Sequence, residues 1–526
     1  MKKLVSLLLA VVMLLGMSGA VAETAEPVTL TIAMPVNAKV ADVNTNQLTL
    51  WLEEKMNVNL EFIQLNTADT ATQVHMLMTS GDLPDVLMGY NMPYDMMCSF
   101  ADAGLLLPLD ELAEQYATEE GLLRFEREFP ATNPRAYAVY DGHLYAMPAG
   151  SSMITNVYNA FSMRIQSRFL ENLGIEKVPT TLQEFYDYLV AVRDQDANGN
   201  GDPSDEIPLT SATHNNFHLC LIRNIGNAFQ YTEPNDYMYA KDGKVHFIGN
   251  NDLYKETVLY LKKLVDEKLL EPAAFTQDSA TLASRQSGEP YLLGAVGIGY
   301  HISTAMDTST QAYNDFVPIY AMEGPYGYKT TGIQVPSVRR AAVITTACEN
   351  PEAAFKFLDF CLTEEAGLAF RVGFEGSEWR KAEEGELGRN GEQAKWTLLK
   401  GQEWTQPSTN VIWDTETNNF ANIMNFIYDN KPLVAPTKYQ EQTPLTLAIE
   451  SAKNEYLPPL QIDPEDALEY NEIKKMITDH VTSSTLLFAL GDKSMDEWDA
   501  YCAELEAMGL ERYIEMTQAA YDKMFK

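Results

Sequence analysis

The sequence is poor in basic residues and in cysteine. Its 526 residues contain 38 Lys and Arg against 74 Asp and Glu, which gives a formal net charge of −36. Nucleic-acid binding is therefore not expected, because phosphate contacts need clustered Lys and Arg. The same charge disfavours docking on an anionic membrane. Five cysteines are too few for a disulfide framework at this length, and their odd number leaves at least one unpaired.

The common catalytic motifs are also missing. The sequence has no H-E-x-x-H, G-x-S-x-G or G-x-x-x-x-G-K-[ST], and no G-x-G-x-x-G between a strand and a helix. His214 and His218 have the spacing of a zinc pair but lack the adjacent glutamate, so we interpret them as polar surface. A carboxylate pair for glycoside hydrolysis is a spatial arrangement, and 74 acidic residues make it impossible to recognise. Nothing here indicates an enzyme.

Apolar runs are short except at the start of the chain. Lys2 and Lys3 precede an apolar run over residues 4–15, and small residues then end in Ala22. This order is typical of a secretory signal peptide cut after Ala22. A membrane anchor is the alternative, but the run is shorter than the roughly 20 residues of a spanning helix. A lipoprotein signal would need a cysteine where Met17 stands. We expect a soluble, exported chain.

Strand and helix patterns alternate after this segment. Residues 28–34 and 58–65 alternate as strands do, residues 46–56 and 70–79 have helical spacing, and a short buried strand follows Pro84. This β-α-β-α-β order predicts a parallel sheet with helices on both faces. Ligands bind such sheets beyond the carboxyl ends of the strands. The candidate ligand-binding residues at these ends are Asn37, Tyr90, Asn91 and Asp95.

Three later helices have clear start signals. Thr181 with Glu184, and Ser494 with Glu497, have the spacing of a capping box. Asn350 precedes a proline at the first helical position. Single hydrophobic cores stop growing near roughly 250–300 residues, so helices spread over this length predict two or more folded units.

The most specific chemical pattern is a loop, DQDANGNGDPSDEIP, at residues 194–208. It places acidic and amide oxygens at alternate positions among glycines, and calcium takes about six to eight such oxygens. One EF-hand register starts at Asp194 and closes on Asp205. The other uses Asp196, Asn198, Asn200, Asp202, Asp205 and Glu206. An acidic solvated turn is the alternative. We expect calcium, as a structural staple rather than a catalyst.

Aromatic residues are abundant, with 27 Tyr, 21 Phe and 6 Trp. Aromatic rings pack against the C–H faces of sugars while Asp, Asn and Glu accept from hydroxyls, so these residues suit a carbohydrate cleft. For any single Trp, a place in the hydrophobic core is at least as common as a place in a binding site. Three tryptophans stand in polar, non-periodic surroundings and are further ligand-binding candidates: Trp379, Trp404 and Trp413.

Six segments form an ordered set over almost the whole mature chain. They are GDLPDV (81–86), DGHLYAMP (141–148), residues 173–209, NPEAAFKFLDF (350–360), GFEG (373–376) and the stretch that starts at Trp498. Together they resemble the extracellular solute-binding proteins of ABC importers, family 1, in particular the lipoprotein-A-type branch that includes alginate-binding proteins.

The resemblance implies an α/β fold, a two-lobed clamshell like that of periplasmic binding proteins, in which each lobe is a mainly parallel sheet flanked by helices. After a signal peptide over residues 1–22, lobe I would contain residues 23–152 and 335–395, and lobe II residues 153–334 and 396–526. The family's calcium ligands carry over best in the second register. Pro203 and Ser204 are inserted where some relatives have a shorter spacer, which leaves the carbonyl ligand and Asp205 open.

By this resemblance the protein is not an enzyme but a receptor, which captures a carbohydrate, an oligosaccharide in the first instance, by hinge closure and delivers it to ABC permease subunits. A secreted polysaccharide hydrolase or lyase, or a binding protein for peptides or another solute, is the alternative. We expect a monomer, extracellular or periplasmic, at the outer face of the cytoplasmic membrane. Gram-positive relatives usually carry a lipobox cysteine at the place of Met17, so release, a periplasmic location and an uncleaved signal anchor all stay open.

Overall fold

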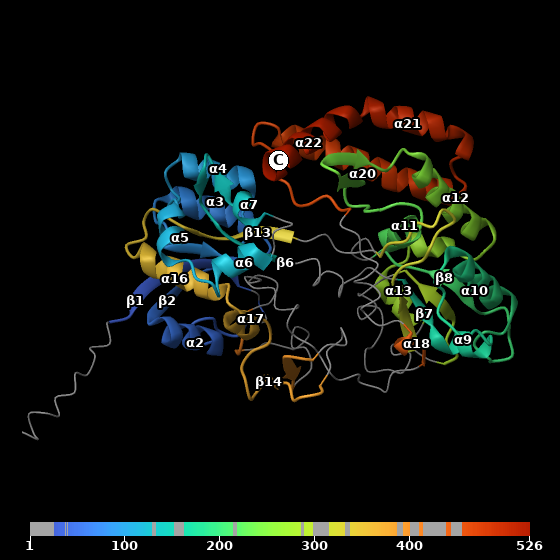
Figure 1. The fold of residues 1–526 in the computed structure, drawn as a ribbon, viewed down its shortest axis with the longest axis horizontal. Helices are drawn as coiled ribbons and strands as arrows, with labels where there is room; N and C mark the ends of the chain where they lie inside the picture. The colour runs from blue at the N-terminus through green and yellow to red at the C-terminus, as the bar shows by residue number, and fades with distance from the viewer. Residues whose placement is uncertain are drawn as a thin grey trace, which may run out of the picture.

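The computed structural model describes most of the chain after residue 25. The described ranges are residues 26–36, 38, 40–128, 133–151, 163–213, 218–285, 289–297, 315–331, 337–386, 393–399, 410–413, 438–442 and 455–526. Figure 1 shows two α/β units side by side, with the C-terminal helices lying along one of them. Each unit has its own sheet and its own large hydrophobic core. The two-lobed α/β fold that we predicted is confirmed.

Lobe I contains a five-stranded sheet. Its strand order is β2 (Val58–Asn66), β1 (Val28–Val36), β3 (Val86–Met88), β13 (Ser337–Ile344) and β6 (Met147–Ser151). Strand β1 pairs in parallel with both β2 and β3, as the β-α-β-α-β pattern predicted. Strand β13 is antiparallel to β3 and to β6, because the chain leaves the sheet at the end of β6 and re-enters it at the same edge, where Ser337 pairs with Ser151. The sheet is therefore mixed.

Helices cover both faces of this sheet (Figure 1). They are α2 (Gln47–Met56), α3 (Thr70–Ser80), α4 (Tyr94–Asp102), α5 (Asp110–Tyr116), α6 (Leu122–Glu128), α7 (Pro134–Tyr137), α16 (Pro351–Cys361) and α17 (Glu364–Arg371). Asn46 caps α2, since its side-chain oxygen accepts from the N–H of Leu48. The predicted Asn350 cap is wrong, because the Asn350 side chain makes no cap hydrogen bond and only the proline at the first turn of α16 is as expected.

Lobe II contains a four-stranded sheet with the order β12 (Phe316–Ile319), β7 (Met163–Gln166), β11 (Leu293–Val296) and β8 (Ile207–Thr210). The neighbours β8 and β11 are parallel, whereas β7 is antiparallel to both β11 and β12. Three of the four strands, β8, β11 and β12, therefore run in one direction. Strand β7 follows directly on the chain's entry from lobe I and runs against its neighbours.

The helices of lobe II are α9 (Ser167–Asn172), α10 (Leu182–Asp194), α11 (His218–Gly226), α12 (Asp252–Asp266), α13 (Ser279–Ser284) and α18 (Lys438–Glu441). Thr181 caps α10 as predicted. The capping box is incomplete, because the Glu184 carboxylate accepts from the N–H of Thr180 and not from that of Thr181. A hairpin of β9 (Met238–Lys241) and β10 (Lys244–Phe247) stands beside the sheet.

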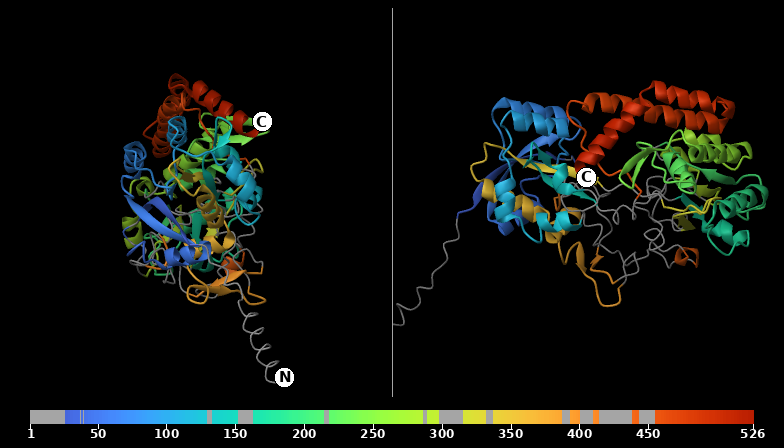
Figure 2. Two further views of the ribbon diagram at one scale, coloured as in Figure 1. Left: turned by 90° about the vertical axis from the view of Figure 1, so that its left-hand side faces the viewer. Right: turned by 45° about the horizontal axis from the view of Figure 1, so that its top comes forward.

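The last helices belong to the core of lobe II. They are α20 (Ala467–Leu490), α21 (Trp498–Ala507) and α22 (Leu510–Phe525), and both views of Figure 2 show them as one layer. Tyr470, Val481, Trp498 and Tyr513 are buried in the same core as the helices α10 and α12. The Ser494–Glu497 capping box is confirmed, and it opens the short turn before α21.

One expected lobe boundary does not match the contacts. Strand β15 (Trp396–Leu398) pairs with β14 (Trp379–Lys381), and Trp413 lies in the core of lobe I. The backbone of Gln47 also donates to the carbonyl of Asn410 at 2.9 Å. Residues 396–398 and 410–413 thus pack with lobe I, although we had expected residues 396–526 in lobe II. The pairing of a late segment with early helices is invisible in local sequence patterns.

Candidate functional site: the ligand edges of two sheets

One edge of the lobe I sheet gathers three of the predicted ligand-binding residues. Strands β1, β3 and β6 end at this edge and β13 begins there. Tyr90, Asn91 and Asp95 follow β3 directly, as the topology predicted. The Asn91 Oδ1 accepts the backbone N–H of Arg340 at 3.3 Å, and the N–H of Met92 donates to the Arg340 carbonyl at 3.2 Å. The loop after β3 is therefore fixed to the start of β13.

Tyr90 and Asp95 have a direct electrostatic relationship. The Tyr90 ring is half-buried, and burial raises the pKa of its hydroxyl, with a further upward contribution from the Asp95 carboxylate. Asp95 is exposed in the first turn of α4, where a carboxylate is favoured by the helix dipole. A neutral phenol beside an exposed carboxylate presents a ring, a donor and an acceptor, which are the groups that a sugar uses.

Arg340 is a residue of this edge that the sequence reasoning missed. Its guanidinium carbon lies 4.1 Å from the ring centroid of Tyr137 and 4.8 Å from that of Tyr94. The side chain is only 3% exposed, Nη1 donates to the carbonyl of Met92 at 3.4 Å, and burial lowers the guanidinium pKa. No carboxylate of the described residues lies within ion-pair distance of it. Aromatic rings thus replace an acid as its partners.

The lobe II sheet has a comparable polar edge. Strands β8 and β11 end at the edge where β7 begins. The Gln277 amide donates to the Ser211 carbonyl and to the Thr210 hydroxyl, both at 2.7 Å. The guanidinium of Arg285 in turn donates to Glu271 and to the Gln277 side-chain oxygen, at 2.7 and 2.9 Å. A connected polar network therefore follows the end of β8, and no sequence motif had indicated it.

Of the predicted tryptophans, Trp379 and Trp413 do not join these edges. Trp413 is fully buried, its ring contacts Phe62 and Phe370, and its Nε1 donates to the Thr49 hydroxyl at 2.8 Å. The prediction that Trp413 binds a solute is therefore wrong, because no face of its ring is accessible. Trp379 is half-buried against Trp396 and donates to the Gly373 carbonyl at 3.0 Å. Asn37 and Trp404 lie outside the described residues.

The acidic loop of lobe II closes on itself through its own oxygens. The Asn200 N–H donates to Asp196 Oδ1 at 3.0 Å, and the Asn200 amide donates to Asp205 Oδ2 at 2.7 Å. The Asn198 amide donates to the other Asp205 oxygen at 2.9 Å, and the Asn198 N–H donates to Glu206 Oε1 at 3.1 Å. Asp196, Asp205 and Glu206 thus converge on the stretch from Asn198 to Asn200.

Glu206 gives this loop a free acceptor. Its Oε2 is buried without a hydrogen-bond partner, and burial raises the pKa of the carboxyl. The Asp202 carboxylate accepts from the N–H of Ser204 at 3.1 Å. Oxygens only, one of them buried and unpaired, suit a hard cation such as calcium. Within the described ranges no three His, Cys, Asp or Glu side chains alone could hold a metal, so amide and carbonyl oxygens would have to complete the set.

The contacts also distinguish the two registers of the loop. Both oxygens of the Asp194 carboxylate accept from the guanidinium of Arg193, at 2.7 and 2.8 Å. Asp196, the first residue of the second register, instead accepts from the N–H groups of Gly199, Asn200 and Gly201. The geometry favours the register that starts at Asp196.

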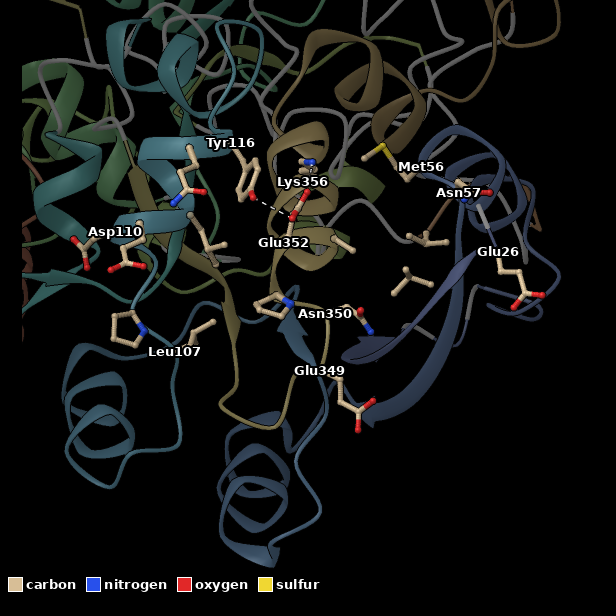
Figure 3. Close-up of a pocket in the computed structure, with 18 of the residues that line it drawn as sticks. Glu26, Met56, Asn57, Leu107, Asp110, Tyr116, Glu349, Asn350, Glu352 and Lys356 are labelled. Carbon is tan, nitrogen blue, oxygen red and sulfur yellow. Dashed lines mark hydrogen bonds and ion pairs between the residues drawn. The ribbon is translucent and has the colours of Figure 1, made fainter. Parts of the chain in front are cut away.

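A separate hollow lies at the opposite edge of the lobe I sheet, where β1 and β2 begin (Figure 3). It encloses about 1200 Å³, and its lining includes Glu26, Asp110, Glu349 and Glu352. The Tyr116 hydroxyl donates to Glu352 at 3.0 Å inside it. Because strands begin here, this hollow is distant in the fold from Tyr90 and is not part of the ligand edge.

Comparison with known proteins identifies the family. Residues 35–368 match the family model described as bacterial extracellular solute-binding protein. The chain belongs to this family. Over 513 residues it is 25% identical to the fructooligosaccharide ABC transporter substrate-binding protein FusA of Streptococcus pneumoniae, and the alignment covers 94% of this chain and 89% of FusA. Among the described residues, no helix has the length and apolar composition to cross a membrane.

Solved structures share the fold of this solute-binding protein. A solute-binding protein of Bifidobacterium longum infantis, described as binding human milk oligosaccharides (HMO), has a TM-score of 0.73 at 19% identity over 95% of this chain and 99% of the other. FusA with kestose has a TM-score of 0.66 at 21% identity, covering 94% and 99%. The alginate-binding protein AlgQ2, described without its calcium ion, has 0.58 at 19% identity, covering 95% and 99%. A further FusA structure is described as an EF-hand mutant.

Proposed function

We propose that this protein is an extracytoplasmic receptor that captures an oligosaccharide between its lobes and delivers it to the permease of an ABC transporter, without chemistry of its own. The observation that carries the proposal is the match to FusA, a fructooligosaccharide-binding protein, over nearly the full length of both chains. The positions of Tyr90, Asn91 and Asp95 at one sheet edge supply the groups for such a ligand. Closure of two lobes on one solute follows from contacts made by both.

A thermal-shift screen followed by calorimetry tests this function. Kestose, human milk oligosaccharides, N-glycan fragments and alginate oligomers form the panel, because these are the ligand classes of the related proteins. Binding of one of them raises the melting temperature by mass action. Release of reducing sugar or of unsaturated product from the same panel would instead identify a hydrolase or lyase. A shift with peptides alone would indicate a peptide receptor.

The Tyr90→Ala variant tests the placement of the ligand. Because the Tyr90 ring is only half-buried, its loss should weaken binding about tenfold or more while the melting temperature stays within a few degrees. Tyr116→Ala is the matched control, since Tyr116 is also half-exposed but lies in the hollow at the opposite edge of the sheet. Equal affinities of the two variants would remove Tyr90 from the site.

Calcium in the 196–206 loop is part of the same proposal. The donor set in the second register, the buried unpaired Glu206 oxygen and the description of FusA with an EF-hand support it. When bound, the ion would supply one positive centre that holds the loop between α10 and β8 together. We place it as a staple because the loop lies at the end of α10 and supplies its ligands from one short segment.

The cellular setting is inferred from family and sequence together. The signal-like residues 1–22 lie outside the described residues, and the family is extracellular. We place the mature chain at the outer face of the cytoplasmic membrane, as a monomer that meets permease subunits. Intact-mass analysis of the exported protein separates cleavage after Ala22 from an uncleaved signal anchor.

A further inference from the structure

Lobe I and lobe II touch through the short helix α7. The Asn133 amide of lobe I donates to the carbonyl of Met524, at the end of α22, at 2.8 Å. From the other side, the Gln461 amide of lobe II donates to the carbonyls of Ala136, at 2.9 Å, and of Tyr137. Figures 1 and 2 place the C-terminal end of α22 on the side of its lobe that faces lobe I. Three hydrogen bonds therefore cross between the lobes at one small place.

Both amide side chains are held firmly on their own lobe. Gln461 is 5% exposed, and its backbone N–H points to the sulfur of Met524 at 3.2 Å. Asn133 has the left-handed backbone that favours Asn among non-glycine residues, with φ of 44°, and its Oδ1 accepts from the N–H of Ala136 at 3.4 Å. The same Asn133 side chain thus caps α7 and holds lobe II.

The position of α7 gives this contact a role in motion. Helix α7 packs on β6 and β13, and these are the strands at which the chain leaves lobe I, after Ser151, and re-enters it, at Ser337. A rotation between lobes moves atoms least near the places where the chain crosses. Hydrogen bonds formed there can persist while the ligand edges approach each other.

The contact also connects to the ligand edge by direct packing. Tyr137, whose carbonyl accepts from Gln461, lies with its ring 4.1 Å from the Arg340 guanidinium carbon. Arg340 in turn donates to the Met92 carbonyl in the loop that carries Tyr90 and Asn91. The chain of contacts from lobe II to the ligand-binding loop is thus Gln461, Tyr137, Arg340 and Met92.

We propose that the contact between α7 and the Gln461–Met524 surface is the pivot of lobe closure, with Asn133 and Gln461 as positioning residues that hold the two lobes together at this point during the rotation. The inference rests on the proposed function as a closing receptor, but it concerns the motion of the protein without ligand. The ligand edges would then approach each other by rotation about α7. Arg340 would hold the loop that carries Tyr90 against α7 during this rotation.

The test measures the distance between lobes in the unliganded full chain. Spin labels at Glu114→Cys on α5 and Glu171→Cys on α9, both exposed, report this distance, with the half-buried Cys348 and Cys502 changed to Ser. Gln461→Ala and Asn133→Gly each remove donors across the contact, and Gly tolerates the left-handed backbone at position 133. Each lost hydrogen bond removes a restraint that the open and closed forms share, so the lobes gain freedom about the contact and the distance distribution should broaden.

Gln518→Ala is the matched control. The Gln518 side chain also bonds to backbone, at Val245 and Gly243, but stays within lobe II. We expect all three variants to have similar melting temperatures, with a changed distance distribution only for Gln461→Ala and Asn133→Gly. A wild-type distribution in those two variants would overturn the pivot, whether or not their melting temperatures fall. The distance measurement contains no sugar, so it does not depend on the binding screen. Failure to bind any oligosaccharide in that screen would contradict the proposed function but would leave the distance result unaffected.

Discussion

The backbone N–H of Asn198 donates to Oε1 of Glu206 at 3.1 Å, while Oε2 of the same carboxylate is buried without a partner. A buried carboxylate oxygen without a partner is unfavourable by itself. The loop therefore gains stability from any cation that reaches this oxygen.

Removal of calcium should lower the melting temperature by several degrees, because an ion that binds only the folded loop stabilises it by mass action. Glu206→Gln should abolish the difference between calcium and chelator, as measured by differential scanning calorimetry. Asp194→Asn is the control, since the contacts place Asp194 on Arg193 and outside the favoured register. Loss of the calcium response in Asp194→Asn would instead support the register that starts at Asp194. A wild-type melting temperature that calcium does not change would contradict the calcium site.

The Arg223–Glu233 ion pair should contribute to the stability of lobe II only as an intact pair. The two side chains are 4% and 3% exposed and join at 2.7 Å. Glu233→Gln removes one charge and leaves a buried guanidinium, which should lower the free energy of unfolding by about 3–5 kcal/mol. Urea unfolding measures this loss. Asp479→Asn, in the exposed Lys475–Asp479 pair, should cost about 0.5 kcal/mol or less. Equal effects of both variants would contradict the burial of the first pair.

Asp236 should make stability depend on pH in the opposite sense to a typical carboxylate. Burial raises the pKa of Asp236 to about 6 from 3.8, with Lys474 opposing and Glu233 adding to the shift. The folded state therefore binds a proton that the unfolded state has released between these values. Its contribution is present below about pH 4 and is lost as pH rises to about 6, by up to about 3 kcal/mol.

Urea unfolding of the wild type and of Asp236→Asn between pH 4 and 7 isolates this contribution. Asparagine keeps an oxygen that can accept the N–H of Met238, at 3.0 Å in the wild type, but carries no charge. The variant should gain relative stability as pH rises. A difference between the two proteins that does not change with pH would show that Asp236 titrates normally.

Trp413→Ala should unfold lobe I rather than weaken ligand binding directly. Deleting a buried tryptophan costs about 3–5 kcal/mol, and the Thr49 hydroxyl loses its donor as well. Calorimetry should show a lowered transition for lobe I. Trp379→Ala, at a half-buried ring, should cost clearly less. A stable Trp413→Ala protein with lost sugar affinity would reinstate Trp413 as a binding residue.

Local patterns predicted much of this fold. The strand and helix alternation from Val28 onward and the Thr181 and Ser494 caps are confirmed, because neighbouring residues determine them. The place of Tyr90 beyond β3 followed from topology alone. The Asp196 loop was visible because all its oxygens lie in one segment.

Long-range partners account for the errors. Trp413 stands among polar residues in sequence, but its hydroxyl partner Thr49 is 364 residues away, so a polar neighbourhood gave no sign of burial. Arg340 meets Asn91 across 249 residues, and no spacing rule connects them. The sequence of β13 could not reveal that this strand lies between β3 and β6 in the lobe I sheet after the chain has passed through lobe II.

The return of late residues to lobe I also sets an order of events during synthesis. The N–H of Leu48 donates to the Val411 carbonyl at 3.0 Å, and the Asn46 amide donates to Ile412 at 3.1 Å, so the start of α2 waits for residues made more than 360 positions later. Contacts of such sequence separation form slowly. The core of lobe II includes α20, α21 and α22, so this lobe also waits for the last residues of the chain, and an emerging N-terminal half remains incomplete. The export that we propose would benefit from that delay, because a chain that folds late stays unfolded for longer during its passage.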